Sequence, residues 1–243
     1  MTFNFSTVDS SWLPLIQNAL NEVSSDYKRS LLQDPNWLPG PDAVFNAFSL
    51  PLAQLKVILF GESPYPRAIS ANGYAFYDAS VDHLWSKTGL SKAVNRATSL
   101  RNIIKMLLVA EGALSADDLS QTAIAALDKS LFIQTLPELF QRLQEKGFLL
   151  LNASLVLSSK PVQIDIKAWQ PFMAKLLALI FEKAPQTELL LWGRLAQMID
   201  HFPQSHRFKR HYAEHPYNLS FIHNPEILAY FRPLHLLNRH QHA

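Results

Sequence analysis

The sequence contains no cysteine among its 243 residues. Disulfides, thiolate metal sites, cysteine-ligated iron–sulfur clusters and thiol catalysis are therefore excluded. Glycine is scarce as well, at seven residues, and no glycine-rich phosphate loop occurs. The absence of that loop argues against a nucleotide-binding α/β protein.

Long hydrophobic runs are also missing. The longest, "FLLLNASLVL" and "FMAKLLALIF", are too short and too interrupted to span a bilayer. The first residues, "MTFNFSTVDSSW", have no basic stretch followed by an apolar run, so we expect no secretory signal. The expected setting is cytoplasmic, away from membranes. The net charge of +2 and the pI near 8.8 permit an acidic partner without demanding one.

The apolar content of 48% is enough for one large domain with a substantial core. We find no internal repeat, low-complexity run or linker-like stretch, which favours a single domain over residues 1–243. Within it, residues 1–50 are expected to form helix and loop packed on a sheet.

Four short runs predict the strands of that sheet: Leu55–Phe60, Gly147–Ala153, Thr187–Gly193 and Lys209–His215. The first three are almost continuously apolar, which is typical of parallel strands covered on both faces. The fourth is polar and has the weakest pattern. Helical patterns lie between them, over 99–114 with Ser99 as the expected N-cap, and over 136–147, 168–185 and 193–202. This alternation predicts an α/β fold with a parallel sheet.

Polar or backbone-exposing residues follow the end of each predicted strand. In open parallel sheets, ligands bind beyond the carboxyl ends of the strands. Glycine and proline commonly end strands, so any one of these ends is most simply an ordinary loop. All four together indicate a site. Its residues are Glu62 and Ser63, Asn152, Gly193 and Arg194, and His215.

Six segments in the same order resemble the uracil-DNA glycosylase superfamily. "VFNAFSLPLAQLKVILFGESPYP" resembles the "VF-AF" segment that leads into "VVILGQDPYH", and "NGYAF" resembles "HGLAF". "TSLRNIIK", "GFLLLNASLVL", "LLLWGRLAQ" and "EHPYNLS" resemble "PSLKNIYK", "GVLLLNTVLT", "FLLWGSYAQ" and "AHPSPLS". The resemblance covers about residues 35–240 and is closest to the main branch. It implies a three-layer fold, in which helices flank a central four-stranded, mainly parallel sheet.

The resemblance also implies a pocket for a uracil flipped out of DNA. Phe76 matches the aromatic residue that stacks on the base, although an ordinary core role is an alternative. Asn152 matches the amide that reads the uracil edge, since an amide offers both a donor and an acceptor. Tyr65 matches the residue that blocks a 5-methyl group and so rejects thymine. A tyrosine packed between two prolines is the alternative there.

His215 matches the histidine that hydrogen-bonds uracil O2 as negative charge develops on the leaving base. His223, in "HNPEIL", is a rival, but "HPYNLS" keeps the spacing to leucine and serine. Leu219 matches the wedge that enters the duplex where the base leaves. The resemblance places three residues at phosphates: Ser99, Gly193 and Ser220. The basic segment 206–211, "HRFKRH", is either a solvated face or an additional DNA contact.

The first motif departs from the family pattern at its catalytic position. The main branch has an aspartate that activates water, but this chain has Glu62 followed by Ser63. Loss of such a base typically lowers the rate by ~10²–10⁴. In one interpretation Glu62 substitutes, as in a branch with "GEAPG" whose iron–sulfur cluster this chain cannot hold. In the other, the site is degenerate and only binds DNA or a base.

Further departures concern the surroundings of that motif. Pro66 replaces the motif histidine, and Arg194 replaces the serine after Gly193, where it would add or obstruct a phosphate contact. "KAVNRAT" stands in place of the proline-rich loop before Ser99, and "FIHNPEILAYF" (221–231) is an extra segment.

The leading hypothesis is a monofunctional DNA glycosylase without cofactor or metal. It would excise uracil or a related damaged pyrimidine from DNA, in base excision repair, and work as a monomer. The competing hypothesis is a catalytically degenerate DNA-binding or protein-interaction module on the same fold, motivated by Ser63 and Pro66.

Overall fold

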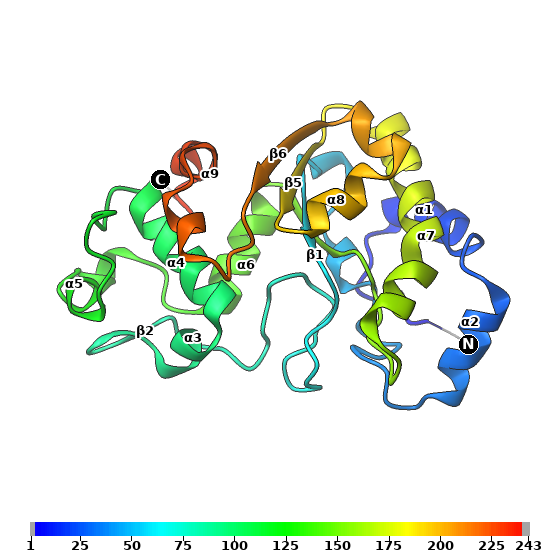
Figure 1. Ribbon diagram of the computed structural model, residues 1–243, viewed down its shortest axis with the longest axis horizontal. Helices are drawn as coiled ribbons and strands as arrows, with labels where there is room; N and C mark the ends of the chain where they lie inside the picture. The colour runs from blue at the N-terminus through cyan, green and yellow to red at the C-terminus, as the bar shows by residue number, and fades with distance from the viewer. Residues whose placement is uncertain (1–2, 240–243) are drawn as a thin grey trace. The chain divides into compact units, whose positions relative to one another are not determined.

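The computed structural model describes residues 3–239 of the chain (Figure 1). These residues form two compact units. The sheet unit comprises residues up to Ala79 together with Gly147–Arg210, and the helical unit comprises Ser80–Lys146 together with the residues from His211 onward. The chain passes from one unit to the other after Ala79, Lys146 and Arg210. A single domain over residues 1–243 stays a prediction.

The central sheet has four strands, and the prediction of an α/β fold is confirmed. They are β1 (Val57–Gly61), β4 (Phe148–Asn152), β5 (Glu188–Trp192) and β6 (Lys209–Ala213), in the order β4-β1-β5-β6. Strand β1 pairs parallel with β4 and with β5, and the register sets Gly61 opposite Asn152. All five residues of β1 and of β4 are buried, as their apolar runs predict. The polar fourth strand is also present at its predicted start.

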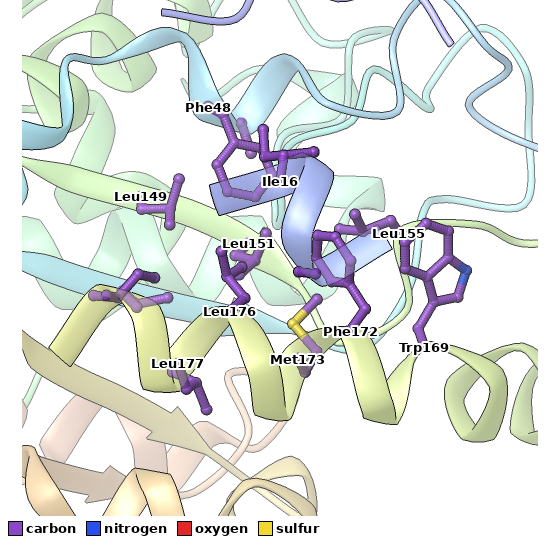
Figure 2. Packing of buried hydrophobic residues seen from close by; sticks show 14 of the residues in the cluster. Ile16, Phe48, Leu149, Leu151, Leu155, Trp169, Phe172, Met173, Leu176 and Leu177 are labelled. Carbon is purple, nitrogen blue, oxygen red and sulfur yellow. The ribbon is translucent and has the colours of Figure 1, made fainter. Parts of the chain in front are cut away.

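Helices of the sheet unit cover the central strands. Helices α1 (Leu13–Leu20) and α7 (Val162–Lys183) lie side by side (Figure 1). Figure 2 shows Phe172, Met173 and Leu176 of α7 packed toward Leu149 and Leu151 of β4. The same unit contains α2 (Ser25–Gln33) and α8 (Leu195–Asp200). This shared core fixes the ends of β1, β4 and β5 relative to one another.

The helical unit is built around α4 (Thr98–Ala110), whose apolar face is buried. It also contains α3 (Lys92–Arg96), α5 (Gln121–Ala125), α6 (Leu136–Glu145) and a short ribbon of β2 (Trp85–Ser86) and β3 (Gly89–Leu90). The extra segment 221–231 folds into the 3₁₀-helix η6 (Leu219–His223) and α9 (Pro225–Phe231). Both pack on α4, and Figure 1 shows α9 beside it. This segment is therefore part of the unit's core.

The start of helix α4 differs from its prediction. Ser99 is not the N-cap of α4: the cap is Ala97, which makes no side-chain cap bond, and Ser99 lies in the first turn. The reason is that α3 ends immediately before, and the Ala97 N–H bonds to carbonyls of α3. The chain thus turns from one helix into the next without a polar cap.

None of the helices within residues 3–239 has both the length and the apolarity needed to cross a bilayer.

Candidate functional site

The ends of β1 and β4 meet at a glycine. Gly61 is the register partner of Asn152, and a Cβ atom at position 61 would lie 2.5 Å from Asn152 Oδ1 and 2.8 Å from Ala75 Cβ. The Ala75 N–H donates to the Leu150 carbonyl at 3.0 Å, which ties the "NGYAF" segment to β4. Only glycine leaves room here for the asparagine amide, because both contacts are shorter than real Cβ atoms tolerate.

Asn152 is the central polar group of this edge. Its side chain closes an apolar strand and is only 2% exposed. Among residues 3–239, no side chain or backbone group forms a hydrogen bond with its amide. The amide nitrogen and oxygen are not among the fully enclosed unsatisfied atoms, so the small exposed part of the residue leaves them open to a ligand or water. An unsatisfied donor and acceptor pair held in this position is suited to a ligand that carries the complementary pair.

Phe76 follows Ala75 in a strained conformation. Its φ of 62° lies in the left-handed region, which residues other than glycine rarely adopt. Such residues cost of order 1–3 kcal/mol and cluster at ligand sites. Its ring packs against that of Trp192 at the end of β5, with centroids 5.4 Å apart and planes at 56°. The ring is half-buried, so it contacts the core on one side and retains an accessible part.

Tyr65 packs beside Phe76. Its hydroxyl donates to the Phe76 carbonyl at 3.4 Å, a long bond. Burial, and then the nearby Asp78 carboxylate, raise the pKa of Tyr65 to about 12. The phenol is therefore neutral throughout the physiological range, and it acts as a bulky, uncharged wall.

The first motif places Glu62 and Ser63 directly after β1. The Glu62 carbonyl accepts from the Ser154 N–H at 3.0 Å, so its backbone is fixed against the segment after β4. The Glu62 side chain is exposed, and no cation or donor among residues 3–239 engages its carboxylate. Within residues 3–239, Ser63 Oγ makes only a 3.5 Å contact with the neighbouring Pro64 carbonyl. The carboxylate rather than the hydroxyl is thus equipped to accept a proton.

Gly193 and Arg194 follow β5 and lead into α8. Gly193 has a φ of 65°, which favours glycine, and its carbonyl accepts from the Ala196 N–H at 3.2 Å. Arg194 is exposed, and none of the acidic groups in the described part of the chain pairs with it. Its charge is available to an anion.

In the helical unit, His215 begins a tightly bonded turn after β6. The Tyr217 N–H donates to His215 Nδ1 at 3.1 Å, and the Asn218 N–H donates to the His215 carbonyl at 2.9 Å. Because a backbone N–H can only donate, Nδ1 must accept, and the ring proton of the neutral imidazole is on Nε2. The turn therefore sets His215 up as an Nε2–H donor.

A residue that the sequence analysis missed holds this turn in place. Asn102 of α4 is fully buried, and its Nδ2 donates to the carbonyls of Pro216 and Tyr217 at 2.7 and 3.3 Å. An asparagine in the buried face of an apolar helix is the signal that could have found it, since such a group needs partners. Asn102 positions the loop that carries His215.

The rest of this loop is exposed. Leu219 is 62% exposed, as a wedge requires, whereas the rival His223 lies at the end of η6. Glu214 accepts from Asn224 Nδ2 at 3.0 Å, and this bond, with a further one from Ser220, lowers the pKa of Glu214. Ser220 thus already has an anionic neighbour at the position predicted to contact a phosphate.

The basic segment 206–211 is largely engaged within the protein. Lys209 pairs with Glu188 and Arg210 with Asp200, each at 2.8 Å, and the Arg207 guanidinium lies 3.8 Å from the Phe181 ring centre. These contacts favour the interpretation of a solvated structural face.

The predicted residues fall into two groups. The sheet unit brings Glu62, Tyr65, Phe76 and Asn152 to one edge of its sheet, and the helical unit holds His215 and Leu219 on a single loop. Ser99 is half-buried in the first turn of α4, in the helical unit. Among residues 3–239, no group of three or more His, Asp or Glu side chains could hold a metal ion. The roles of these residues, and the absence of a cofactor, stay predictions.

Replacement of Gly61 by alanine should displace the Asn152 amide while the fold persists. The new methyl group would overlap Oδ1, which is the mobile end of a side chain, and Ala75 Cβ. A displacement of about 1 Å at a reacting group can cost ~10²-fold in activity. We expect an activity loss of that order with cooperative thermal unfolding retained. The control change Gly112→Ala, at a glycine with open space around it but a φ of 74°, should cost some stability through backbone strain and leave activity unaltered. Equal activity losses in the two variants would contradict the close approach.

No model of a known protein family matches the chain. The wild-type UNG crystal structure from Nitratifractor salsuginis is similar, with 40% identity and a TM-score of 0.90, over 96% of this chain and 93% of that one. Among curated proteins, uracil-DNA glycosylase of Borreliella burgdorferi is 27% identical over 202 residues, covering 78% of this chain and 75% of the relative. That of Lactococcus lactis is 29% identical over 187 residues, covering 73% and 71%.

Proposed function

Because this chain belongs to the uracil-DNA glycosylase family, we propose that it excises uracil from DNA in base excision repair. The observation that carries the proposal is the Asn152 side chain at the end of β4, which is 2% exposed and whose amide has no hydrogen-bond partner among residues 3–239. Uracil presents an N3–H donor beside an O4 acceptor, and an amide is the side chain that complements both. Binding the base would satisfy both amide groups at once.

Hydrolysis breaks the bond between uracil N1 and deoxyribose C1′. The bonding electron pair leaves with the base, whose charge spreads onto O2. Water oxygen forms the new bond to C1′, and a proton from that water passes to the Glu62 carboxylate and then to solvent. Glu62 suits this role because its carboxylate is exposed and no group within residues 3–239 engages it. A positioned base of this kind contributes ~10²–10⁴ in rate.

His215 would stabilise the departing base. Its Nε2–H, fixed by the bond that Nδ1 accepts from Tyr217, is a neutral donor for the developing charge on O2. A donor that is already oriented costs no reorganisation during the reaction. Phe76 would stack on the base, and its strained backbone and contact with Trp192 hold the ring in place.

The remaining residues would contact the DNA rather than the uracil base. Leu219 is exposed and apolar, as a side chain that fills the position of an extruded base must be. Arg194, Gly193, Ser99 and Ser220 would contact phosphates, Arg194 as a free cation and Gly193 through its backbone. We also infer that the protein is monomeric and cytoplasmic. Light scattering at assay concentrations checks the monomeric state.

Incubation with uracil-containing oligonucleotides tests the proposal. Single-stranded and duplex substrates are treated with alkali to cleave abasic sites, and free uracil is measured directly. We expect uracil release from both. No product at enzyme excess, from uracil or its oxidised derivatives, would leave only the non-catalytic module.

Replacement of Tyr65 by alanine should admit thymine. The neutral phenol ring supplies bulk at the proposed position of the 5-methyl group, and removing it opens that space. We expect the preference for uracil over thymine to fall at least about tenfold, because a contact with one methyl-sized group typically contributes discrimination of about that size. Tyr65→Phe keeps the ring and should keep the preference. Release of thymine measured from matched oligonucleotides decides the point: equal selectivity in both variants would assign the block to another residue.

A further inference from the structure

Tyr217 has a fixed backbone and an exposed ring. Its N–H donates to His215 Nδ1 at 3.1 Å, and its carbonyl accepts from the buried Asn102 at 3.3 Å. The side chain is 66% exposed, and its hydroxyl has no hydrogen-bond partner in the part of the chain that the structure describes. The ring therefore contributes little to folding, although hydrogen bonds fix the backbone of Tyr217.

The segment around Tyr217 is likewise anchored at both ends and exposed in between. Pro216 on one side and Phe221 on the other are buried, and every residue from Tyr217 to Ser220 is exposed. Two of the largest exposed apolar side chains of the protein, Tyr217 and Leu219, lie two residues apart on this anchored segment. Single exposed apolar residues need no explanation. Two on one anchored loop form a surface that is organised before it binds.

We propose that Tyr217 stacks on a nucleobase next to the extruded one, as a second insertion residue beside Leu219. This inference rests on the proposed function. An aromatic ring stacks on any base, because every base has a π-face, whereas leucine can only fill space. The anchored backbone lowers the conformational entropy lost when the ring is immobilised on DNA. The "AHPSPLS" pattern that this loop resembles has serine at this position, so the ring is a distinct feature of this chain.

The stack would form when DNA binds and persist through bond cleavage. An interaction of equal strength in the ground and transition states lowers KM and leaves kcat unchanged. We therefore expect Tyr217→Ala to raise KM about 5- to 150-fold, which corresponds to ~1–3 kcal/mol per stacked base, with kcat nearly unaltered. Tyr217→Phe and Tyr217→Trp keep an aromatic face and should stay within about threefold of the wild type.

A matched control is available on β6. Tyr212 is also an exposed tyrosine of the helical unit, at 39% exposure, but it lies outside the anchored loop. Tyr212→Ala should leave KM within about twofold. Thermal unfolding of all variants separates lost stability from lost stacking.

Direct evidence would come from 2-aminopurine fluorescence. The fluorophore is placed 5′ to, 3′ to, or opposite a 2′-fluorinated deoxyuridine that resists hydrolysis. We expect the wild type, Tyr217→Phe and Tyr217→Trp to change the emission at one of these positions, and Tyr217→Ala to lose that change. The responding position identifies which base is stacked.

The outcomes separate this role from the proposed function. If the wild type releases uracil but Tyr217→Ala matches it in KM and in fluorescence at every position, the stacking role alone is overturned. If the wild type releases no uracil, the proposed function fails and the stacking role fails with it. A loss that Tyr217→Phe shares with Tyr217→Ala would assign the effect to the hydroxyl and also overturn the stack.

Discussion

Replacing Glu62 with glutamine should lower uracil excision by ~10²–10⁴ at neutral pH and leave DNA binding nearly unchanged. Glutamine keeps the shape of the side chain but cannot accept a proton from water. Glu62 is exposed and is not paired within residues 3–239, so the change breaks no structural bond. Single-turnover release of uracil measures the chemical step, and retention on a fluorinated-uracil duplex measures binding.

Two comparisons make this result specific. Glu182→Gln alters another exposed glutamate of the sheet unit, at the end of α7, and should not affect the rate. Ser63→Asp introduces the carboxylate of the main branch next to Glu62. If Glu62 is the working base, Ser63→Asp gains little in the wild-type background. A large gain from Ser63→Asp, together with an unaffected Glu62→Gln variant, would instead identify a degenerate first motif.

The sheet could be predicted from sequence because its information is local. Three almost continuously apolar runs of six or seven residues permit few structures other than buried parallel strands. All three observed strands lie within two residues of their predicted bounds. The polar β6 had the weakest pattern of the four predicted strands, and it is present from its predicted start, Lys209. Helix α7 was predicted from residue 168, but it begins at Val162 and continues through Pro171. When only local propensity is considered, a proline indicates the beginning of a helix rather than its interior.

Other features depend on contacts that no local pattern encodes. The close approach at Gly61 follows from the register of β1 with β4, and the Phe76–Trp192 contact joins residues more than a hundred positions apart. The anchor from Asn102 to the loop after β6 and the burial of segment 221–231 on α4 are likewise long-range. The sequence therefore indicated which residues were polar at strand ends, and the structure was needed to show how their backbones are held.

Changing Asn152 to leucine should abolish uracil excision and should not destabilise the protein. The side chain is 2% exposed and its amide has no partner among residues 3–239, so the amide adds little to stability and carries at most part of the roughly 1–3 kcal/mol that a sealed unpaired amide costs. Leucine has a similar size and removes that cost, so we expect an equal or higher Tm. Leucine cannot form the two hydrogen bonds to uracil N3–H and O4. Their loss should lower kcat/KM by about 10⁴, the size of effect found in sites that recognise a polar group of the substrate by hydrogen bonds.

Asn152→Asp provides the companion experiment, because it keeps the shape and changes only the donor. A carboxylate can accept from uracil N3–H but opposes O4 with a second acceptor. Its burial favours the protonated form, which could accept from the cytosine amino group and donate to cytosine N3. We expect the uracil-to-cytosine preference to fall by several orders of magnitude. If Asn152→Leu instead lowers Tm while Asn152→Asp keeps full uracil activity, the amide serves the fold and the base is recognised elsewhere. If Asn152→Leu raises Tm and abolishes activity, the amide is retained for base recognition at the expense of stability. Natural proteins accept such a loss of stability at functional sites.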